Sequence, residues 1–201
     1  MISSLGAVIV SAFLALYLSE RKEKKRSRSL VATCLESLYI QSPIIEYYFS
    51  LLAGTPKGVS WTRTKETLPV LFEYSNRTKP FDIPFDKVRE NLLELNVDIA
   101  DMIMRLEIRV RQLNRFLVEW TEAFSDQRKT NYGEILKDLD ANQRLYGWMA
   151  EYVRLLAFTS RNARKQLFEG RRKIIVDWGS VEAKDDEMDK LYMESGGVRD
   201  G

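Results

Sequence analysis

The stretch PFDKVRENLLELNVDIADMIMRLEIRVRQLNRFLVEWTEAF (residues 84–124) decides the fold of this chain, because no proline or glycine follows its first residue. Apolar side chains recur along it in steps of three or four, the spacing of one face of an α-helix. The steps form a heptad pattern with one extra residue between Ile99 and Ile103. We therefore predict a helix over 84–125, about 60 Å long. Its apolar seam comprises Phe85, Val88, Leu92, Leu95, Ile99, Ile103, Leu106, Val110, Leu113, Leu117, Trp120 and Phe124.

A second periodic stretch follows after a short polar segment and predicts a helix over 131–168. Asn131 and Glu134 are spaced as a capping pair at its start. Two long helices joined by a short loop are expected to fold back as an antiparallel hairpin. The second seam comprises Tyr132, Ile135, Leu139, Asn142, Tyr146, Met149, Val153, Leu156, Ser160, Ala163 and Leu167.

Charge patterning suggests a register for this hairpin. If the turn centres near Arg128, facing residues have numbers that add to about 255. Five pairs of charged residues then face each other with opposite sign, and Glu122 opposite Glu134 is an exception near the turn. Such exposed pairs contribute about 0–1 kcal/mol each, so they select a register more than they stabilise it. The predicted pairs are Glu90 with Lys165, Glu94 with Arg161, Arg105 with Glu151, Arg115 with Asp140, and Glu119 with Lys137.

The opening residues have the pattern of a membrane anchor. Residues 1–18 contain no charged side chain and would span about 27 Å as a helix. No basic region precedes the apolar run and no small-residue cleavage motif ends it, so a cleaved signal is disfavoured. We predict a transmembrane anchor over 1–19, with the N-terminus outside and the body cytoplasmic; a buried core helix is the alternative. The basic juxtamembrane segment 20–29 sets this topology, binds anionic lipid, or both, through Arg21, Lys22, Lys24, Lys25, Arg26 and Arg28.

A stripe of small side chains also runs down the anchor at four-residue spacing. Small residues in this pattern let two helices approach closely within a bilayer. The high serine and alanine content of the segment is the alternative explanation. The stripe predicts contact with another transmembrane helix or a second copy, through Ser3, Ala7, Ser11, Ala15 and Ser19.

The C-terminal region, residues 171–201, differs in character from the rest. It begins with a β-prone run, RRKIIVDWG, that we expect to pack on the hairpin or to bind a partner in extended form. The remainder is acidic and ends in glycines, which favours a flexible tail. A short docking helix is the alternative, because Met188, Leu191 and Tyr192 fall at helical spacing.

The residue types that are missing exclude several functions. The chain has no histidine and one cysteine, Cys34, which is expected to be a small buried hydrophobe. No nucleotide-binding, hydrolase or calcium-loop motif is present, so we expect no cofactor and no metal. The net charge of +2 is concentrated in the basic segment. The arginine-rich run MRLEIRVRQLNRF has acidic partners in the predicted hairpin, and we expect no nucleic-acid partner.

Taken together, the sequence predicts an all-α protein with a single N-terminal transmembrane helix. Its cytoplasmic helical domain, residues 30–170, is built on the coiled-coil-like hairpin. The leading hypothesis is a protein-interaction or assembly role at the cytoplasmic membrane face, with a cytoplasmic protein as partner. One alternative is a membrane-surface enzyme without histidine chemistry, using carboxylates such as Asp98 and Asp101. The other is a small membrane-perturbing protein.

Overall fold

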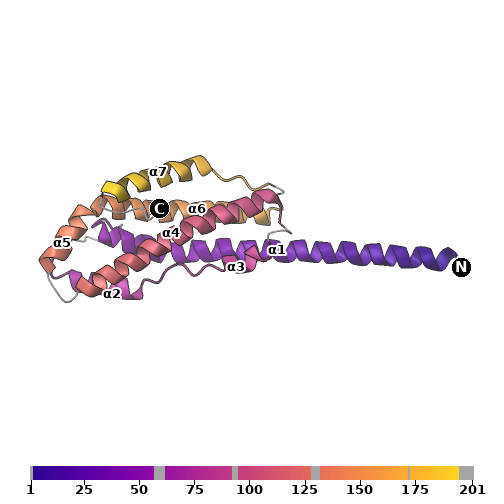
Figure 1. Ribbon diagram of the computed structural model, residues 1–201, viewed down its shortest axis with the longest axis horizontal. Coiled ribbons are helices and arrows are strands. Elements are labelled where there is room, and N and C mark those ends of the chain that lie inside the picture. Colours follow the sequence, from indigo (N-terminus) through magenta and orange to yellow (C-terminus); the bar gives the residue numbers. More distant parts are fainter. Residues whose placement is uncertain (1, 57–61, 92–94, 128–131, 172, 195–201) are drawn as a thin grey trace.

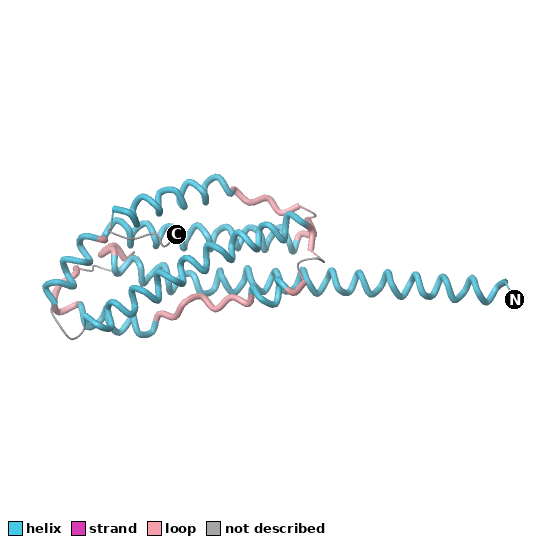
Figure 2. The backbone as a smooth tube through the Cα atoms, viewed as in Figure 1, coloured by secondary structure: helices cyan, strands magenta, loops and turns pink. Residues whose placement is uncertain are grey.

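The computed structural model describes residues 2–56, 62–91, 95–127, 132–171 and 173–194. Within these ranges, residues 2–13, 120, 123–127, 189 and 192–194 are described by their backbone alone. The described elements are all helical, as Figure 2 shows, so the predicted all-α class is confirmed for this part of the chain. They are α1 (Ile2–Leu52), α2 (Leu68–Arg77), α3 (Phe85–Arg89), α4 (Val97–Gln127), α5 (Tyr132–Ala141), α6 (Gln143–Phe168) and α7 (Trp178–Glu194).

Helix α1 has two halves with different surroundings. Its N-terminal half projects from the body as a single rod that ends at the N-terminus (Figure 1). Every described side chain from Leu14 to Arg26 is exposed, and burial begins at Ser27. The C-terminal half is part of the core, where Leu35, Leu38 and Phe49 are at most 1% exposed. The helix continues through Pro43, which is exposed, so the carbonyl group left without its intrahelical donor can reach water.

The main partner of α1 is α6, and the two helices run antiparallel. Arg154 Nε donates to Glu46 Oε1 at 2.8 Å, and Arg164 forms an ion pair with Glu36. The Arg161 guanidinium lies 5.7 Å from the Tyr39 ring centroid. A Cβ atom at Gly147 would lie 3.9 Å from that of Ala53, so this glycine stands where the two helices meet. In all four contacts the residue numbers add to 200, which defines the register.

The predicted hairpin is therefore wrong about the helix that pairs with α6, which is α1 and not α4. The faces that it predicted to be buried on α4, α5 and α6 are largely correct. On α4, Ile99, Ile103, Leu106, Val110, Leu113 and Leu117 are buried, as the seam predicts. On α5 and α6 the seam is buried from Ile135 onward except at Asn142, which is half-buried, whereas Tyr132 is 47% exposed. These faces enter a common core that α1 also occupies. Because α1 supplies the long antiparallel partner of α6, α4 packs instead on α2 and α5.

The predicted helix 84–125 is interrupted at polar side chains. Helix α3 ends at Arg89, where Asn91 Nδ2 donates to the Lys87 carbonyl oxygen at 2.8 Å. Helix α4 begins at Val97, and the preceding Asn96 Oδ1 accepts a hydrogen bond from the Asp98 amide at 2.9 Å. Asparagine side chains compete in this way with the helical hydrogen-bond ladder. The second predicted helix is also divided, at Asn142, where α5 ends and α6 begins; Asn131 lies outside the described residues.

A buried arginine connects the ends of two helices. Arg63 Nη1 donates to the carbonyl oxygens of Leu52 at 2.9 Å and Leu139 at 2.7 Å, at the C-terminal ends of α1 and α5. Its side chain is 9% exposed and also pairs with Asp140 at 2.8 Å. A cation suits this position because helix C-termini carry partial negative charge and unpaired carbonyl groups. Gly54 closes α1 with a φ of +71°, and Arg63 Nε fills the space beside it.

Candidate functional site

The basic segment lies on the projecting half of α1. Arg28, the last of the six bases, is half-buried, and its Nη2 donates to the Arg171 carbonyl oxygen at 3.1 Å. The body thus begins within one turn of the basic segment. The other five bases are exposed on the rod: Arg21, Lys22, Lys24, Lys25 and Arg26.

The predicted anchor lies largely where side chains are not described. This is the case for Ser3, Ala7 and Ser11 of the small-residue stripe. Ala15 and Ser19 are exposed, and Ser19 Oγ donates to Glu23 Oε1 at 3.5 Å. Within the part of the chain that the structure describes, no helix is both long and apolar enough to cross a membrane. The anchor and its packing stripe remain predictions.

The predicted cross-helix ion pairs are not those of the structure. Glu94 lies outside the described residues, and among the described residues none of the other predicted pairs is within ion-pair distance. These charged side chains instead contact other residues that lie closer in the fold. Arg115 pairs with Glu119 at 2.8 Å on the same helix. The remaining partners are Asp101 and Glu182 for Arg105, Lys184 for Glu151, Arg63 for Asp140, and the Tyr39 ring for Arg161.

Residues 178–194 form a docked helix, so the predicted flexible tail is wrong for this segment. Val181, Met188 and Leu191 of α7 are 0%, 4% and 8% exposed and belong to the common core. Met188 and Leu191 of the docking-helix alternative are buried against the body, whereas the Tyr192 side chain lies outside the described residues. Docking on a partner stays a prediction. The preceding β-prone run forms no strand within its described residues. It packs against α6, where Gln166 exchanges two 2.8 Å hydrogen bonds with the backbone of Ile175.

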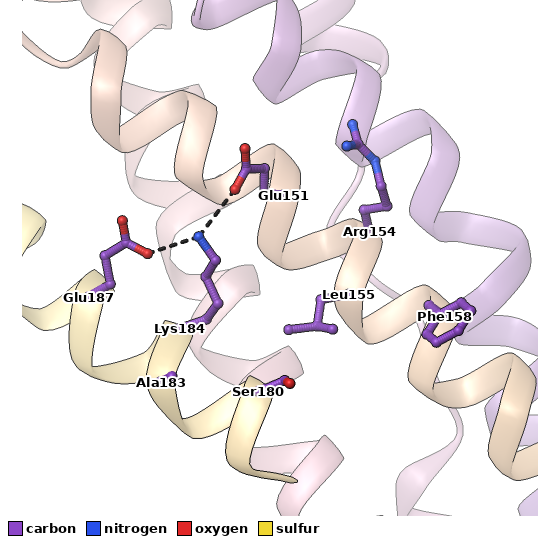
Figure 3. A pocket seen from close by; sticks show the side chains of 8 residues that line it. All are labelled: Glu151, Arg154, Leu155, Phe158, Ser180, Ala183, Lys184 and Glu187. Atoms are coloured by element: carbon purple, nitrogen blue, oxygen red, sulfur yellow. Dashed lines mark hydrogen bonds and ion pairs between the residues drawn. The ribbon is translucent and has the colours of Figure 1, made fainter. Parts of the chain in front are cut away.

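An open groove of about 660 Å³ runs between α6 and α7 (Figure 3). Lys184 reaches across from α7, with its Nζ 3.1 Å from Glu151 Oε2 of α6 and 2.8 Å from Glu187 Oε2. The apolar part includes Leu155 and Phe158, and Phe158 is 61% exposed. Both ends of the Lys184 bridge raise the pKa of its ammonium group, with the Glu187 hydrogen bond as the largest cause. The full lining is Glu151, Arg154, Leu155, Phe158, Ser180, Ala183, Lys184 and Glu187.

A buried polar junction joins α4, α6 and α7 beside this groove. Arg109 Nη2 of α4 lies 2.6 Å from Asp185 Oδ2 of α7, and the Arg109 side chain is 10% exposed. The Tyr152 hydroxyl of α6 donates to the other oxygen of Asp185. Burial, and then the Asp185 carboxylate, raise the pKa of Tyr152 well above its ordinary value, so this hydroxyl remains a donor. A single carboxylate therefore accepts hydrogen bonds from both a buried cation and a buried hydroxyl, while Arg109 Nη1 donates to the Arg105 carbonyl oxygen at 3.0 Å.

An aromatic side chain extends the junction toward the start of α7. The guanidinium carbons of Arg105 and Arg109 lie 5.4 and 5.2 Å from the Trp178 ring centroid, within the range of cation–π attraction. Arg105 Nη1 also donates to Glu182 Oε1 at 2.8 Å. Arg105, which the sequence paired with Glu151 in the hairpin, therefore binds α7 together with Arg109. The helical spacing of Trp178, Val181, Met188 and Leu191, in steps of three, seven and three, was the signal that could have identified this helix.

The carboxylates considered for an enzyme do not meet in this groove. Asp101 pairs with Arg105 Nε at 2.9 Å, and Asp98 is exposed at the start of α4. Neither lines the groove between α6 and α7. Among the described residues, no group of three or more Cys, Asp or Glu side chains could hold a metal ion. Cys34 is 1% exposed, which confirms its expected role as a buried small side chain.

The comparisons with known proteins give no relative. No family model matches the chain, and neither the curated proteins nor the solved structures contain a significant match. The fold and site therefore define the chain only as an all-α protein with a helical body and one projecting helix.

Proposed function

We propose that this protein is a single-pass, membrane-anchored interaction protein. The apolar start of α1 would insert in a bilayer, with the N-terminus outside, and the helical body would bind other proteins on the cytoplasmic side. The observation that carries this role is the continuity of α1. One uninterrupted helix joins an uncharged segment, an exposed basic segment and the core of the body.

The spacing along α1 supports this role. From Ser19 to Arg26 the helix rises about 10 Å, comparable to the screening length at physiological ionic strength. All the exposed bases of the rod are therefore close enough to an inserted segment to interact with anionic head groups. Each would contribute about 1 kcal/mol. The body would begin immediately beyond them, at Ser27.

The uncharged segment also supplies a surface for assembly. The stripe from Ser3 to Ser19 would let another transmembrane helix, or α1 of a second copy, approach closely in the bilayer. Ala15 and Ser19, the described members of this stripe, are exposed on the rod and not used by the body.

A vesicle-flotation experiment tests the membrane role. The full-length protein is expected to float with phosphatidylserine-containing vesicles and to resist alkaline carbonate extraction. The double variant Ile9→Lys/Val10→Lys is expected to remain in the aqueous fraction. Two lysines near the centre of a membrane helix cost about 5–7 kcal/mol, enough to reduce partitioning more than 1,000-fold.

The matched control places the same charges on the body. Ile108 and Val118 are 59% and 41% exposed on α4, so Ile108→Lys/Val118→Lys changes side-chain types and charge equally without altering α1. This control should float like the wild type. Recovery of the wild type in the aqueous fraction, or equal flotation of both double variants, would contradict the proposed anchor.

A further inference from the structure

The contact between α7 and the body combines a short apolar face with several charged contacts. The apolar face of α7 comprises Val181, Met188 and Leu191, with Trp178 partly buried beside them. The groove of about 660 Å³ leaves one edge of α7 unpacked against α6. Ion pairs to α4 and α6 make up much of the rest of the contact between α7 and the body. Ion pairs are weakened by salt more than apolar packing is.

The charges across this contact are complementary. Residues 178–194 carry six acidic and two basic side chains, a net charge of −4. On α4, Arg105 forms an ion pair with Glu182 and Arg109 forms one with Asp185. Both guanidinium groups also lie over the Trp178 ring. Electrostatic complementarity of this kind selects a partner and its register more than it adds affinity.

The centre of the contact requires a carboxylate. Arg109 is 8% exposed and Tyr152 is fully buried, and both bond to Asp185. Without an acceptor here, a buried cation and a buried hydroxyl would lose their shared partner, which is costly. The body therefore specifies the chemistry of its occupant: an amphipathic helix with an apolar stripe and an acidic residue in the middle of it.

We propose that the α4–α6 surface is a receptor for an acidic amphipathic helix from another protein, and that α7 is its resident occupant within the chain. The partner helix would present its carboxylate to Arg109 and Tyr152 and displace α7 as it binds. This inference rests on the interaction half of the proposed function and is independent of the membrane half. Helix-in-groove recognition of this type uses anchor residues on one face of the bound helix. In α7 these are the apolar residues Trp178, Val181, Met188 and Leu191, with Asp185 between Val181 and Met188 on the same face.

Binding of a labelled peptide of residues 178–194 to the detergent-solubilised full-length protein tests the inference. In the wild type, α7 is tethered and competes at a high effective concentration. The variant Asp185→Lys places a cation against Arg109 and should release α7 while leaving the receptor side chains intact. We expect the peptide to bind Asp185→Lys at least tenfold more tightly than it binds the wild type.

Two controls make this result specific. Asp186 is exposed, so Asp186→Lys gives the same charge change without touching Arg109, and it should bind the peptide like the wild type. A peptide that itself carries Asp185→Lys should not bind any of the chains. If Asp185→Lys loses its helical circular dichroism, Asp185→Asn replaces it, since that change removes the carboxylate without adding a cation.

The inference is overturned if the folded Asp185 variant binds the peptide no better than Asp186→Lys does. Equal binding of the two peptides would also overturn it, because recognition would then not depend on the central carboxylate. Either outcome would leave the flotation result unaffected, so the receptor proposal and the membrane-anchor proposal can be refuted separately.

Discussion

Leu156→Ala is expected to destabilise the protein by about 3 kcal/mol, because it leaves a cavity in the core between well-packed helices. Leu156 lies on α6 and is 0% exposed. For a chain of this size the loss corresponds to a decrease in melting temperature of about 6–12 °C. Thermal unfolding followed by circular dichroism measures the change.

The neighbouring Leu155 is a matched control for this substitution. It lies on the same helix but lines the groove between α6 and α7 and is only partly buried. Leu155→Ala should therefore cost less than about 1 kcal/mol. A similar loss at both positions would show that α6 does not present the face that the structure assigns to the core.

Arg63→Met is expected to destabilise the protein by about 2–4 kcal/mol, since it removes charged hydrogen bonds from two helix C-termini. Methionine retains much of the apolar length of the side chain but cannot donate to the carbonyl oxygens of Leu52 and Leu139. The ion pair with Asp140 adds little to this loss, because the Asp140 side chain is 69% exposed. Chemical unfolding by urea measures the effect.

Arg77 provides the control for Arg63. Its side chain is 75% exposed and pairs with Glu73 on the surface of α2. Arg77→Met should change the free energy of unfolding by no more than about 0.5 kcal/mol. If Arg63→Met proved equally neutral, the guanidinium group would not be bridging the ends of α1 and α5.

The sequence predicted which faces are buried but not which helices meet. Periodicity at Ile103 or Val153 reports that one side of a helix is apolar, and this held at nearly every described position. It contains no information on the identity of the partner helix. The charge pairing that appeared to supply this information misled, because Arg105 could be satisfied equally well by Asp101 and Glu182. Exposed ion pairs are too weak to determine a topology.

The helix that the sequence divided is the one that organises the body. The predicted anchor, basic segment and start of the cytoplasmic domain were separate units, yet α1 runs through all three and also through Pro43. Pro43 is tolerated because it lies on the exposed side of a helix whose opposite side is fixed by Ile45, Tyr48 and Phe49. Tertiary packing here overrides a local signal that is reliable for isolated helices.

The candidate site was partly visible in the sequence. Met188 and Leu191 were identified as a docking pair, and both are buried. The receptor side could not be predicted, because Arg109, Tyr152 and Asp185 come from three helices and meet only after folding. The acidic composition of α7 favoured disorder, whereas in the fold that same acidity is matched by arginines on α4.

The most direct test of the central claim, that one helix both projects from the body and forms its core against α6, is a cysteine-crosslinking measurement. Glu46→Cys/Arg154→Cys should be joined rapidly by a short bismaleimide in the vesicle-bound protein, because these positions face each other across α1 and α6. Native Cys34 should not interfere, since burial raises the pKa of its thiol to about 12. Arg105→Cys/Glu151→Cys should remain unlinked, because both positions face α7 instead. Efficient linkage of positions 105 and 151 without linkage of 46 and 154 would contradict the account.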